Sequence, residues 1–273
     1  MPTPASRSAS EHVPRVTPKK ALGQHFLVDP NILSVIDRLA DLEAGDVVLE
    51  VGPGLGVLTR HLAERVSLVH AVEVDRSLEP HLTAALAGAP PTVRLHWGDA
   101  LRSDLAGLDP PATKLVANLP YSIATPLIVE TLVGLPLLRR WCVMVQREVA
   151  DRLFAEPSTK AYGAVSVIVR LTARRTGFHP VSRHVFRPPP RVDSALVAFE
   201  RLDPPPRLAE IRRLVDAGFA HRRKTLANAL ALAGIAEREH VVAALADIGR
   251  PPAVRAEALD PAELVALEDA LRR

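Results

Sequence analysis

The tetrapeptide Asn118-Leu119-Pro120-Tyr121 joins a side-chain amide, a rigid proline and an aromatic ring directly after the apolar run 115–117. The amide oxygen and a backbone carbonyl can both accept hydrogen bonds from an exocyclic amine. Pro120 restricts Leu119 to an extended backbone, which aims its carbonyl, and Tyr121 offers a face for stacking. The four residues suit the binding of a flat base that carries an amine. They are equally common in an ordinary turn after a strand, so other residues must decide between these interpretations.

A glycine-rich turn, 52–56, follows the apolar strand pattern 47–51. Gly52 and Gly54 are candidate ligand-binding positions, because glycine lets the backbone approach a bound molecule closely. The spacing is G-x-G-x-G with Pro53 inside the turn, whereas the dinucleotide fingerprint is G-x-G-x-x-G. Both differences weaken the interpretation as a pyrophosphate-binding turn.

Two acids end the next two strand patterns. Glu73 lies 17 residues after Gly56 (73 − 56), where a carboxylate can accept both hydroxyls of a ribose. Asp99 ends the third pattern and could accept a hydrogen bond from an adenine amine. With the glycine turn and Asn118, these acids form an ordered set along one sheet edge, which fits S-adenosylmethionine better than a dinucleotide. Asp75, by contrast, is interpreted as a helix cap.

The elements that must position these residues alternate between strand and helix. Strand patterns cover 47–51, 68–74, 93–97, 114–117, 141–145 and 194–199, and helix patterns cover 58–66, 78–86, 123–132 and 149–154. Continuous apolar strands in repeated βα units predict a parallel sheet covered on both faces, an α/β fold. Segment 165–171 fits a strand or a helix, and 186–191, with three prolines, is expected to be loop.

The chain is expected to divide into three parts. Residues 1–17 predict a disordered tail. Residues 18–203 carry the α/β pattern and predict a methyltransferase domain of Rossmann-like type. Pro204-Pro205-Pro206 interrupts the chain, and only helical periodicity follows, which predicts a small all-helical domain over 204–273; its basic cluster 221–224 favours a role in binding a polyanion such as RNA.

Composition limits the class of protein. The 273 residues are 48% hydrophobic with a net charge of +3, and basic residues cluster locally, most densely over 221–224, which favours polyanion binding. Cys142 is the only cysteine, lies in an apolar run and is expected to be a buried structural thiol. The apolar runs are too short to predict a membrane segment, and the N-terminal stretch lacks the apolar core of a secretory signal, so we expect a cytoplasmic protein. No metal site is expected.

From 19 to about 267 the chain resembles the KsgA/RsmA ribosomal RNA adenine dimethyltransferases. The motifs that carry the resemblance are 23–27 (GQHFL), 50–54 (EVGPG), 118–121 (NLPY), 160–163 (KAYG), Phe186 with 188–190 (PPP), 192–194 (VDS), 222–225 (RRKT) and 255–257 (RAE). The resemblance implies that S-adenosyl-L-methionine is bound by His25, Leu27, Gly52, Glu73, Asp99 and Asn118. Many relatives carry Asn where this chain has His25; both can donate a hydrogen bond, and His could add pH dependence.

The resemblance also implies the reaction: transfer of methyl groups to N6 of two adjacent adenosines, two methyls each, in a hairpin loop near the 3′ end of 16S rRNA. It makes 165–171 part of a helix. We expect the base to lie between Tyr121 and Phe186, which with Asn118, Leu119 and Pro120 form the catalytic set. RNA contacts are expected from Lys19, Lys20, Arg147, Arg187, Arg191, Arg222, Arg223 and Lys224. The expected partner is 16S rRNA within a 30S subunit precursor, and the protein is expected to act as a monomer.

Three alternatives compete with this interpretation. An Erm-type 23S rRNA adenine methyltransferase shares the motifs around Gly23 and Asn118, but the segments 222–225 and 255–257 favour the small-subunit enzyme. An NAD-dependent dehydrogenase would explain the glycine turn and Glu73 but not the tetrapeptide. A non-enzymatic RNA-binding assembly factor would not need the ordered set of donor-binding residues.

Overall fold

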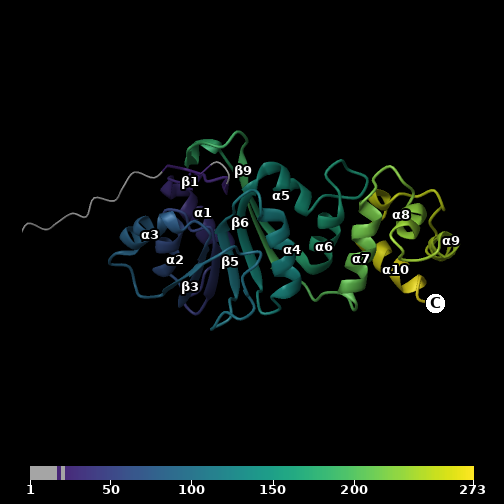
Figure 1. Ribbon diagram of the computed structural model, residues 1–273, viewed down its shortest axis with the longest axis horizontal. Helices are drawn as coiled ribbons and strands as arrows, with labels where there is room; N and C mark the ends of the chain where they lie inside the picture. The colour runs from purple at the N-terminus through teal and green to yellow at the C-terminus, as the bar shows by residue number, and fades with distance from the viewer. Residues whose placement is uncertain (1–16, 20–21) are drawn as a thin grey trace, which may run out of the picture.

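The computed structural model describes residues 17–273 except 20 and 21, so Lys20 and nearly all of the predicted N-terminal tail lie outside the described residues (Figure 1). A seven-stranded sheet in the order β4-β3-β2-β5-β6-β9-β7 forms the centre of the molecule. Its strands are β2 (Val47–Val51), β3 (Leu68–Glu73), β4 (Val93–Trp97), β5 (Lys114–Asn118), β6 (Arg140–Gln146), β7 (Ala173–Val181) and β9 (Ser194–Arg201).

Strands β4, β3, β2, β5 and β6 are parallel, while β9 runs antiparallel to both β6 and β7. The connections carry helices α1 (Pro30–Ala40), α2 (Val57–Ala63), α3 (Glu79–Leu86), α4 (Ala124–Gly134), α5 (Arg147–Leu153) and α6 (Ala164–Thr172). This is the predicted Rossmann-like α/β architecture. Helix α6 also confirms the helix that the family resemblance implied for 165–171.

Both faces of the sheet are covered, as continuous apolar strands require. On β6, Trp141 and Val143 point into a core shared with α4, α5 and β9, while Cys142 and Met144 point into a second core shared with α1 and α2. This alternation follows from the two-residue period of a strand. Burial raises the pKa of the Cys142 thiol to about 12, which agrees with its predicted structural role.

Two parts of the strand prediction were wrong. Segment 186–191 is not wholly loop, because β8 (Phe186–Arg187) pairs antiparallel with β1 (Phe26–Leu27) in a two-stranded sheet of its own. Strand β7 was not predicted; it ends the sheet, where Pro180 is tolerated because one side of an edge strand needs no ladder hydrogen bonds. The 3-10 turns η2 (Arg76–Leu78) and η3 (Arg183–Val185) lead into α3 and β8.

After residue 203 the structure is helical: α7 (Leu208–Phe219), α8 (Leu226–Leu232), α9 (Arg238–Asp247), the 3-10 turn η4 (Ala256–Ala258) and α10 (Pro261–Ala270). Figure 1 shows these helices beyond α6, at the end of the molecule opposite α3. Their core includes Val167 and Ile168 of α6, and the Tyr162 hydroxyl donates to the Leu259 carbonyl at 2.8 Å. Within the described part of the chain, every helix is too short or too polar to cross a membrane.

Candidate functional site

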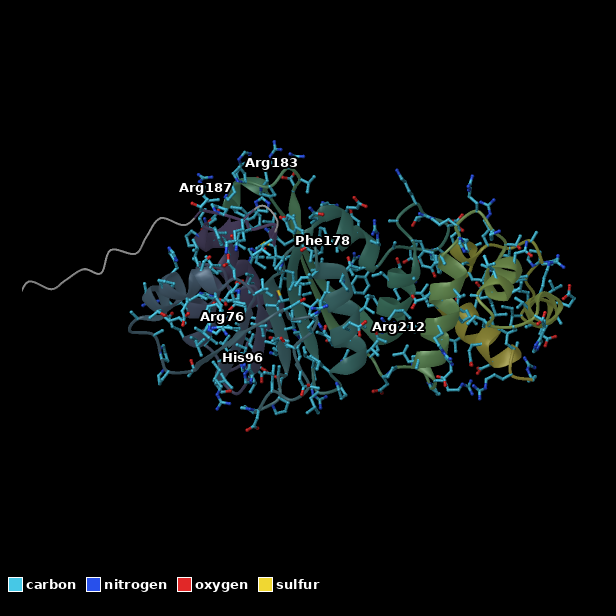
Figure 2. All side chains as sticks on the ribbon, in the orientation of Figure 1. Arg76, His96, Phe178, Arg183, Arg187 and Arg212 are labelled. Carbon is cyan, nitrogen blue, oxygen red and sulfur yellow. The ribbon has the colours of Figure 1, made fainter. Side chains whose placement is uncertain are left out.

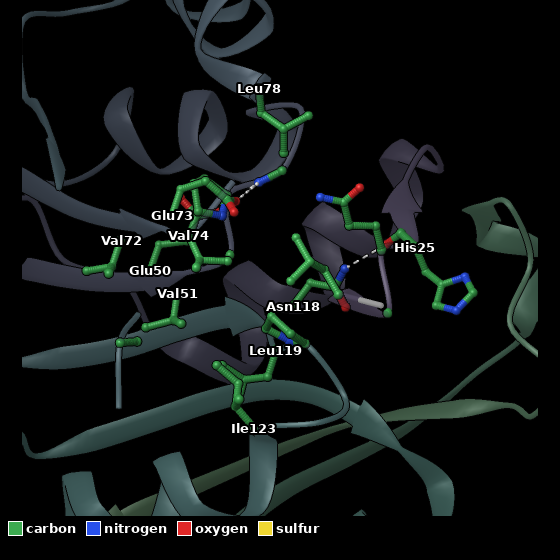
Figure 3. Close-up of a pocket in the computed structure, with 18 of the residues that line it drawn as sticks. His25, Glu50, Val51, Val72, Glu73, Val74, Leu78, Asn118, Leu119 and Ile123 are labelled. Atoms are coloured by element: carbon green, nitrogen blue, oxygen red, sulfur yellow. Dashed lines mark hydrogen bonds between the residues drawn. The ribbon is translucent and has the colours of Figure 1, made fainter. Parts of the chain in front are cut away.

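A cavity of about 210 Å³ lies at the carboxyl ends of the parallel strands (Figure 3). Its walls come from residues 22–27, 50–55 with 57–58, 72–74 with 78, 98–100 and 118–123. Strand β2 has β3 on one side and β5 on the other, so the strand order reverses here. Open α/β sheets bind ligands at such a switch point. The structure thus brings together at one cavity the glycine turn, both predicted acids and the tetrapeptide.

The glycine turn is needed for close packing inside this site. Gly52 and Gly54 have φ angles of +76° and +58°, a region that disfavours other residues. A Cβ on Gly52 would lie 3.0 Å from the Pro120 ring, and one on Gly54 would lie 3.0 Å from the Phe26 ring. The turn therefore lets the tetrapeptide and the N-terminal segment close over the same cavity.

Glu73 is the last residue of β3, and its buried carboxylate lines the cavity. One oxygen accepts from the Asp75 backbone N–H at 2.9 Å and the other from the Gly54 N–H at 3.2 Å. Burial raises the pKa of Glu73, although these backbone hydrogen bonds act in the opposite direction. A carboxylate has about four acceptor sites, so each oxygen can still accept a hydroxyl of a bound ribose.

Asp99 lies in the turn after β4 and also lines the cavity. One of its carboxylate oxygens accepts from the Leu101 backbone N–H at 3.0 Å, which fixes the side chain at the cavity wall. Leu27 of β1 and His25 line the same cavity.

The tetrapeptide extends from the end of β5. The Leu119 N–H donates to the Met144 carbonyl at 3.0 Å, so the ladder with β6 continues one residue beyond the strand. The Asn118 side-chain NH₂ donates to the His25 carbonyl at 3.2 Å, the contact drawn in Figure 3. With its nitrogen committed in this way, the amide has Oδ1 as its acceptor for a ligand.

Tyr121 is held at the mouth of the cavity. Its hydroxyl lies 2.7 Å from Ser194 Oγ, and burial raises the pKa of its phenol. The His25 ring faces it, with centroids 5.6 Å apart and planes inclined by 31°. His25 Nδ1 lies 2.8 Å from the Pro188 carbonyl and donates to it, and the ring points away from Glu73 and Asn118 (Figure 3). The side chain of His25 thus contacts the proline-rich loop and Tyr121, and its backbone contacts Asn118.

The structure does not place Phe186 for the predicted stacking. Its side chain is 0% exposed and belongs to the core under α1 with Ile36 and Leu196. It is absent from the described residues that line the cavity. Its burial follows from the β1–β8 pairing, which the sequence did not reveal. The ring opposite Tyr121 is His25 instead.

Glu50 is a cavity residue that the sequence analysis did not assign a role. It lies on β2, is fully buried and lines the cavity beside Glu73. Its Oε2 has no hydrogen-bond partner among the described residues. Burial raises its pKa to about 8; the Thr59 hydroxyl opposes this shift and the charge of Glu73 adds to it. A charged residue inside the run 47–51 was the signal that could have identified it.

The predicted RNA-contact residues are spread more widely. Arg147 pairs with Asp151 at 2.9 Å and lies over the Phe178 ring, and Arg222 pairs with Glu257 at 3.2 Å. Lys19 donates to Asp75 at 2.6 Å. Arg187, Arg191, Arg223 and Lys224 are exposed. Figure 2 shows Arg183 and Arg187 together on the segment above β1, near the cavity, whereas residues 222–224 lie between α7 and α8.

Comparison with known proteins decides between the alternatives. The profile described as ribosomal RNA adenine dimethylase matches residues 16–254. The chain belongs to the ribosomal RNA adenine dimethylase family. A relative from Rubrobacter xylanophilus, named ribosomal RNA small subunit methyltransferase A, is 49% identical over 263 residues, covering 96% of this chain and 97% of the relative.

Solved structures agree with this assignment. A dimethyladenosine transferase from Plasmodium falciparum superposes with a TM-score of 0.75 at 25% identity, covering 89% of this chain and 96% of that one. The 23S rRNA methyltransferase ErmE gives a TM-score of 0.65 at 28% identity, covering 91% and 100%. The dehydrogenase and the non-enzymatic factor are therefore set aside, and the chain is an S-adenosylmethionine-dependent methyltransferase.

The cavity fits the methyl donor of this family. Glu73 and Asp99 both present carboxylate oxygens to the cavity, which are the acceptors that ribose hydroxyls and an adenine amine require. The unpartnered Oε2 of Glu50 is a further polar atom at the cavity wall, left for a bound molecule. Gly52 and Gly54 add no side chain to the cavity wall, so their backbone can approach a bound molecule closely.

Proposed function

We propose that this protein transfers methyl groups from S-adenosylmethionine to N6 of two adjacent adenosines in the 3′-terminal hairpin loop of 16S rRNA, dimethylating each. The substrate would be 16S rRNA within a 30S subunit precursor, and the protein would act as a cytoplasmic monomer during ribosome biogenesis. The observation that supports this proposal most directly is the orientation of the Asn118 amide. Its nitrogen donates to the His25 carbonyl, and its oxygen is left as an acceptor at the cavity.

The choice of the small subunit rests on similarity. The chain is 49% identical to a relative named ribosomal RNA small subunit methyltransferase A but 28% identical to ErmE. The large-subunit alternative is therefore disfavoured.

The donor supplies an electrophilic methyl group on a sulfonium centre. We assign its binding to His25 (through its backbone), Leu27, Gly52, Gly54, Glu73, Asp99 and Asn118, all of which line the cavity. Glu73 would accept the ribose hydroxyls, and Asp99 the amine of the donor's adenine. These residues would hold the donor in the cavity that Asn118, at the end of β5, also lines.

The target adenine needs activation, because its N6 lone pair is delocalised into the ring. Asn118 Oδ1 and the Leu119 carbonyl would accept the two N–H hydrogens and turn the amine toward tetrahedral geometry, which localises the lone pair. Pro120 holds Leu119 extended for this purpose. As the new N–C bond forms, the S–CH3 bond of the donor would break to leave a neutral thioether, and the amine, acidic only at that stage, would lose its proton to water. Positioning rather than a strong base therefore provides the rate.

Tyr121 would stack on the extruded base, a contact worth about 1–3 kcal/mol in single-strand binders. The His25 ring lies beside it and extends the aromatic surface. Phe186 can take part only if the β1–β8 pair moves, because its ring is buried.

We assign RNA binding to residues 204–273 as a separate helical domain, together with Arg147, Arg187 and Arg191 of domain 18–203. Contacts to phosphate release counterions, so RNA affinity should fall steeply with salt.

The test is transfer of tritiated methyl from S-adenosylmethionine to undermethylated ribosomal particles. The proposal expects label in 16S rRNA of 30S particles and none above background in 50S particles. Label confined to 23S rRNA would establish the Erm-type alternative, and no transfer to either would reject the proposed function.

A further inference from the structure

The buried carboxylate of Asp75 does more than cap a helix. It is 3% exposed and begins η2 by accepting from the Ser77 N–H at 3.0 Å and the Ser77 hydroxyl at 2.6 Å. It also accepts from Lys19 Nζ at 2.6 Å and from Gln24 Nε2 at 2.8 Å. Burial alone would raise the pKa of Asp75, but the hydrogen bonds from Lys19, Ser77 and Gln24 together hold it well below the usual range.

Gln24 connects this carboxylate to the tetrapeptide. It directly precedes His25, whose carbonyl accepts from the Asn118 side chain at 3.2 Å. The backbone N–H of Asp75 in turn donates to Glu73 at 2.9 Å. One connected path therefore runs from Glu73 through Asp75, Gln24 and His25 to Asn118.

We propose that Asp75 is a positioning residue for methyl transfer: by holding Gln24 it fixes the His25 carbonyl, which keeps the Asn118 amide with Oδ1 as the acceptor for the target amine. This inference rests on the proposed function. The orientation matters because a side-chain amide is a donor at one end and an acceptor at the other. A reversed Asn118 would present N–H groups to the N–H groups of adenine.

The path can be tested by reversing one hydrogen bond. In Asp75→Asn the new amide nitrogen faces Gln24 Nε2, donor against donor, and in Gln24→Glu two carboxylates face each other. The double variant Gln24→Glu/Asp75→Asn restores one donor and one acceptor at the same 2.8 Å contact. Each single variant should lower kcat about tenfold, the factor for losing a hydrogen bond to a charged group, with KM for RNA within about twofold of the wild type. The double variant should recover most of kcat, which a merely structural role would not produce.

The matched control is Ser77→Ala, which removes one hydrogen bond from the same carboxylate but leaves Gln24 in place; its kcat should equal that of the wild type. If an Asp75 variant fails to fold, Gln24→Leu tests the same path, because it leaves the Asp75 cap intact. Its kcat should again be about tenfold lower than that of the wild type. Single variants with wild-type kcat, or a double variant no better than the worse single one, would overturn the inference. Failure of the wild type itself to methylate 30S particles would reject the proposed function instead.

Discussion

The donor cavity and the exposed basic cluster 221–224 differ in how they hold their charged groups. Glu73 at the cavity wall and its neighbour Asp75 are buried and already accept backbone or side-chain hydrogen bonds. On the surface, Arg222 is 53% exposed and pairs with Glu257, an acid it must leave to bind phosphate. Groups fixed before the ligand arrives contribute strongly and independently of salt, whereas exposed ion pairs contribute little. Substitutions should therefore have large effects in the cavity and small, salt-dependent effects on the surface.

Asn118→Ala should give the largest effect. Losing the oxygen that accepts from the target amine should lower kcat about 10²–10³-fold, as removal of one preorganised transition-state contact does. Donor affinity should fall only a few-fold, since Glu73 and Asp99 remain. Methyl transfer to 30S particles and calorimetry with the donor measure the two quantities, and Asn31→Ala, on an exposed part of α1, is the control. A variant with near-normal turnover would end the mechanism.

Glu73→Ala should come next, through binding rather than turnover. The carboxylate is the predicted acceptor for two ribose hydroxyls, so donor affinity should fall about 10–100-fold. Glu73→Gln keeps one acceptor oxygen, so its affinity for the donor should lie between those of the wild type and the Ala variant. Unchanged affinity by calorimetry would remove Glu73 from the site.

The sequence predicted the parallel strands and the cavity residues because both depend on local pattern. Short runs rich in β-branched apolar residues, such as 47–51, predict strands buried on both faces, and acids at the carboxyl ends of parallel strands meet at one edge of the sheet. The pairing of β1 with β8 could not be predicted, since two-residue strands carry no periodicity and form only through tertiary contact. That pairing buries Phe186 and leaves His25 opposite Tyr121. Strand β7 was not predicted, because its exposed arginines and Pro180 interrupt the alternation of apolar and polar residues that is typical of a strand.

Glu50→Gln should show how burial acts within the cavity. The pKa of Glu50 is raised to about 8 in the folded protein, so the unfolded chain releases this proton at lower pH than the folded one. The stability associated with Glu50 is therefore full below about pH 4.5, the ordinary pKa, and is lost as pH rises to about 8. A neutral Gln lacks this loss. In urea unfolding, the free energy of unfolding of the variant relative to that of the wild type should increase by a few kcal/mol from pH 5 to pH 8. The increase is at most about 1.4 kcal/mol per pH unit.

If the difference in free energy of unfolding between the variant and the wild type stays constant from pH 5 to pH 8, Glu50 ionises with its ordinary pKa.

Arg222→Ala should have the smallest effect. RNA affinity should fall only a few-fold, and the slope of log K against log salt should decrease by about one, as for the loss of one phosphate contact. Arg60→Ala is the matched control, because Arg60 lies on α2, outside residues 204–273, is 47% exposed and is also paired with an acid, Glu64; its slope should not change. Equal slopes for Arg222→Ala and the wild type would remove Arg222 from the RNA surface.

The central claim is most directly tested by mapping methyl marks on ribosomal RNA from a strain that lacks this gene. Primer extension is blocked by dimethylated N6, so the account predicts a stop at two adjacent adenosines near the 3′ end of 16S rRNA when the wild-type gene is restored. The Asn118→Ala gene should leave those adenosines unmarked. A stop restored equally by both genes, or one found only in 23S rRNA, would contradict the account.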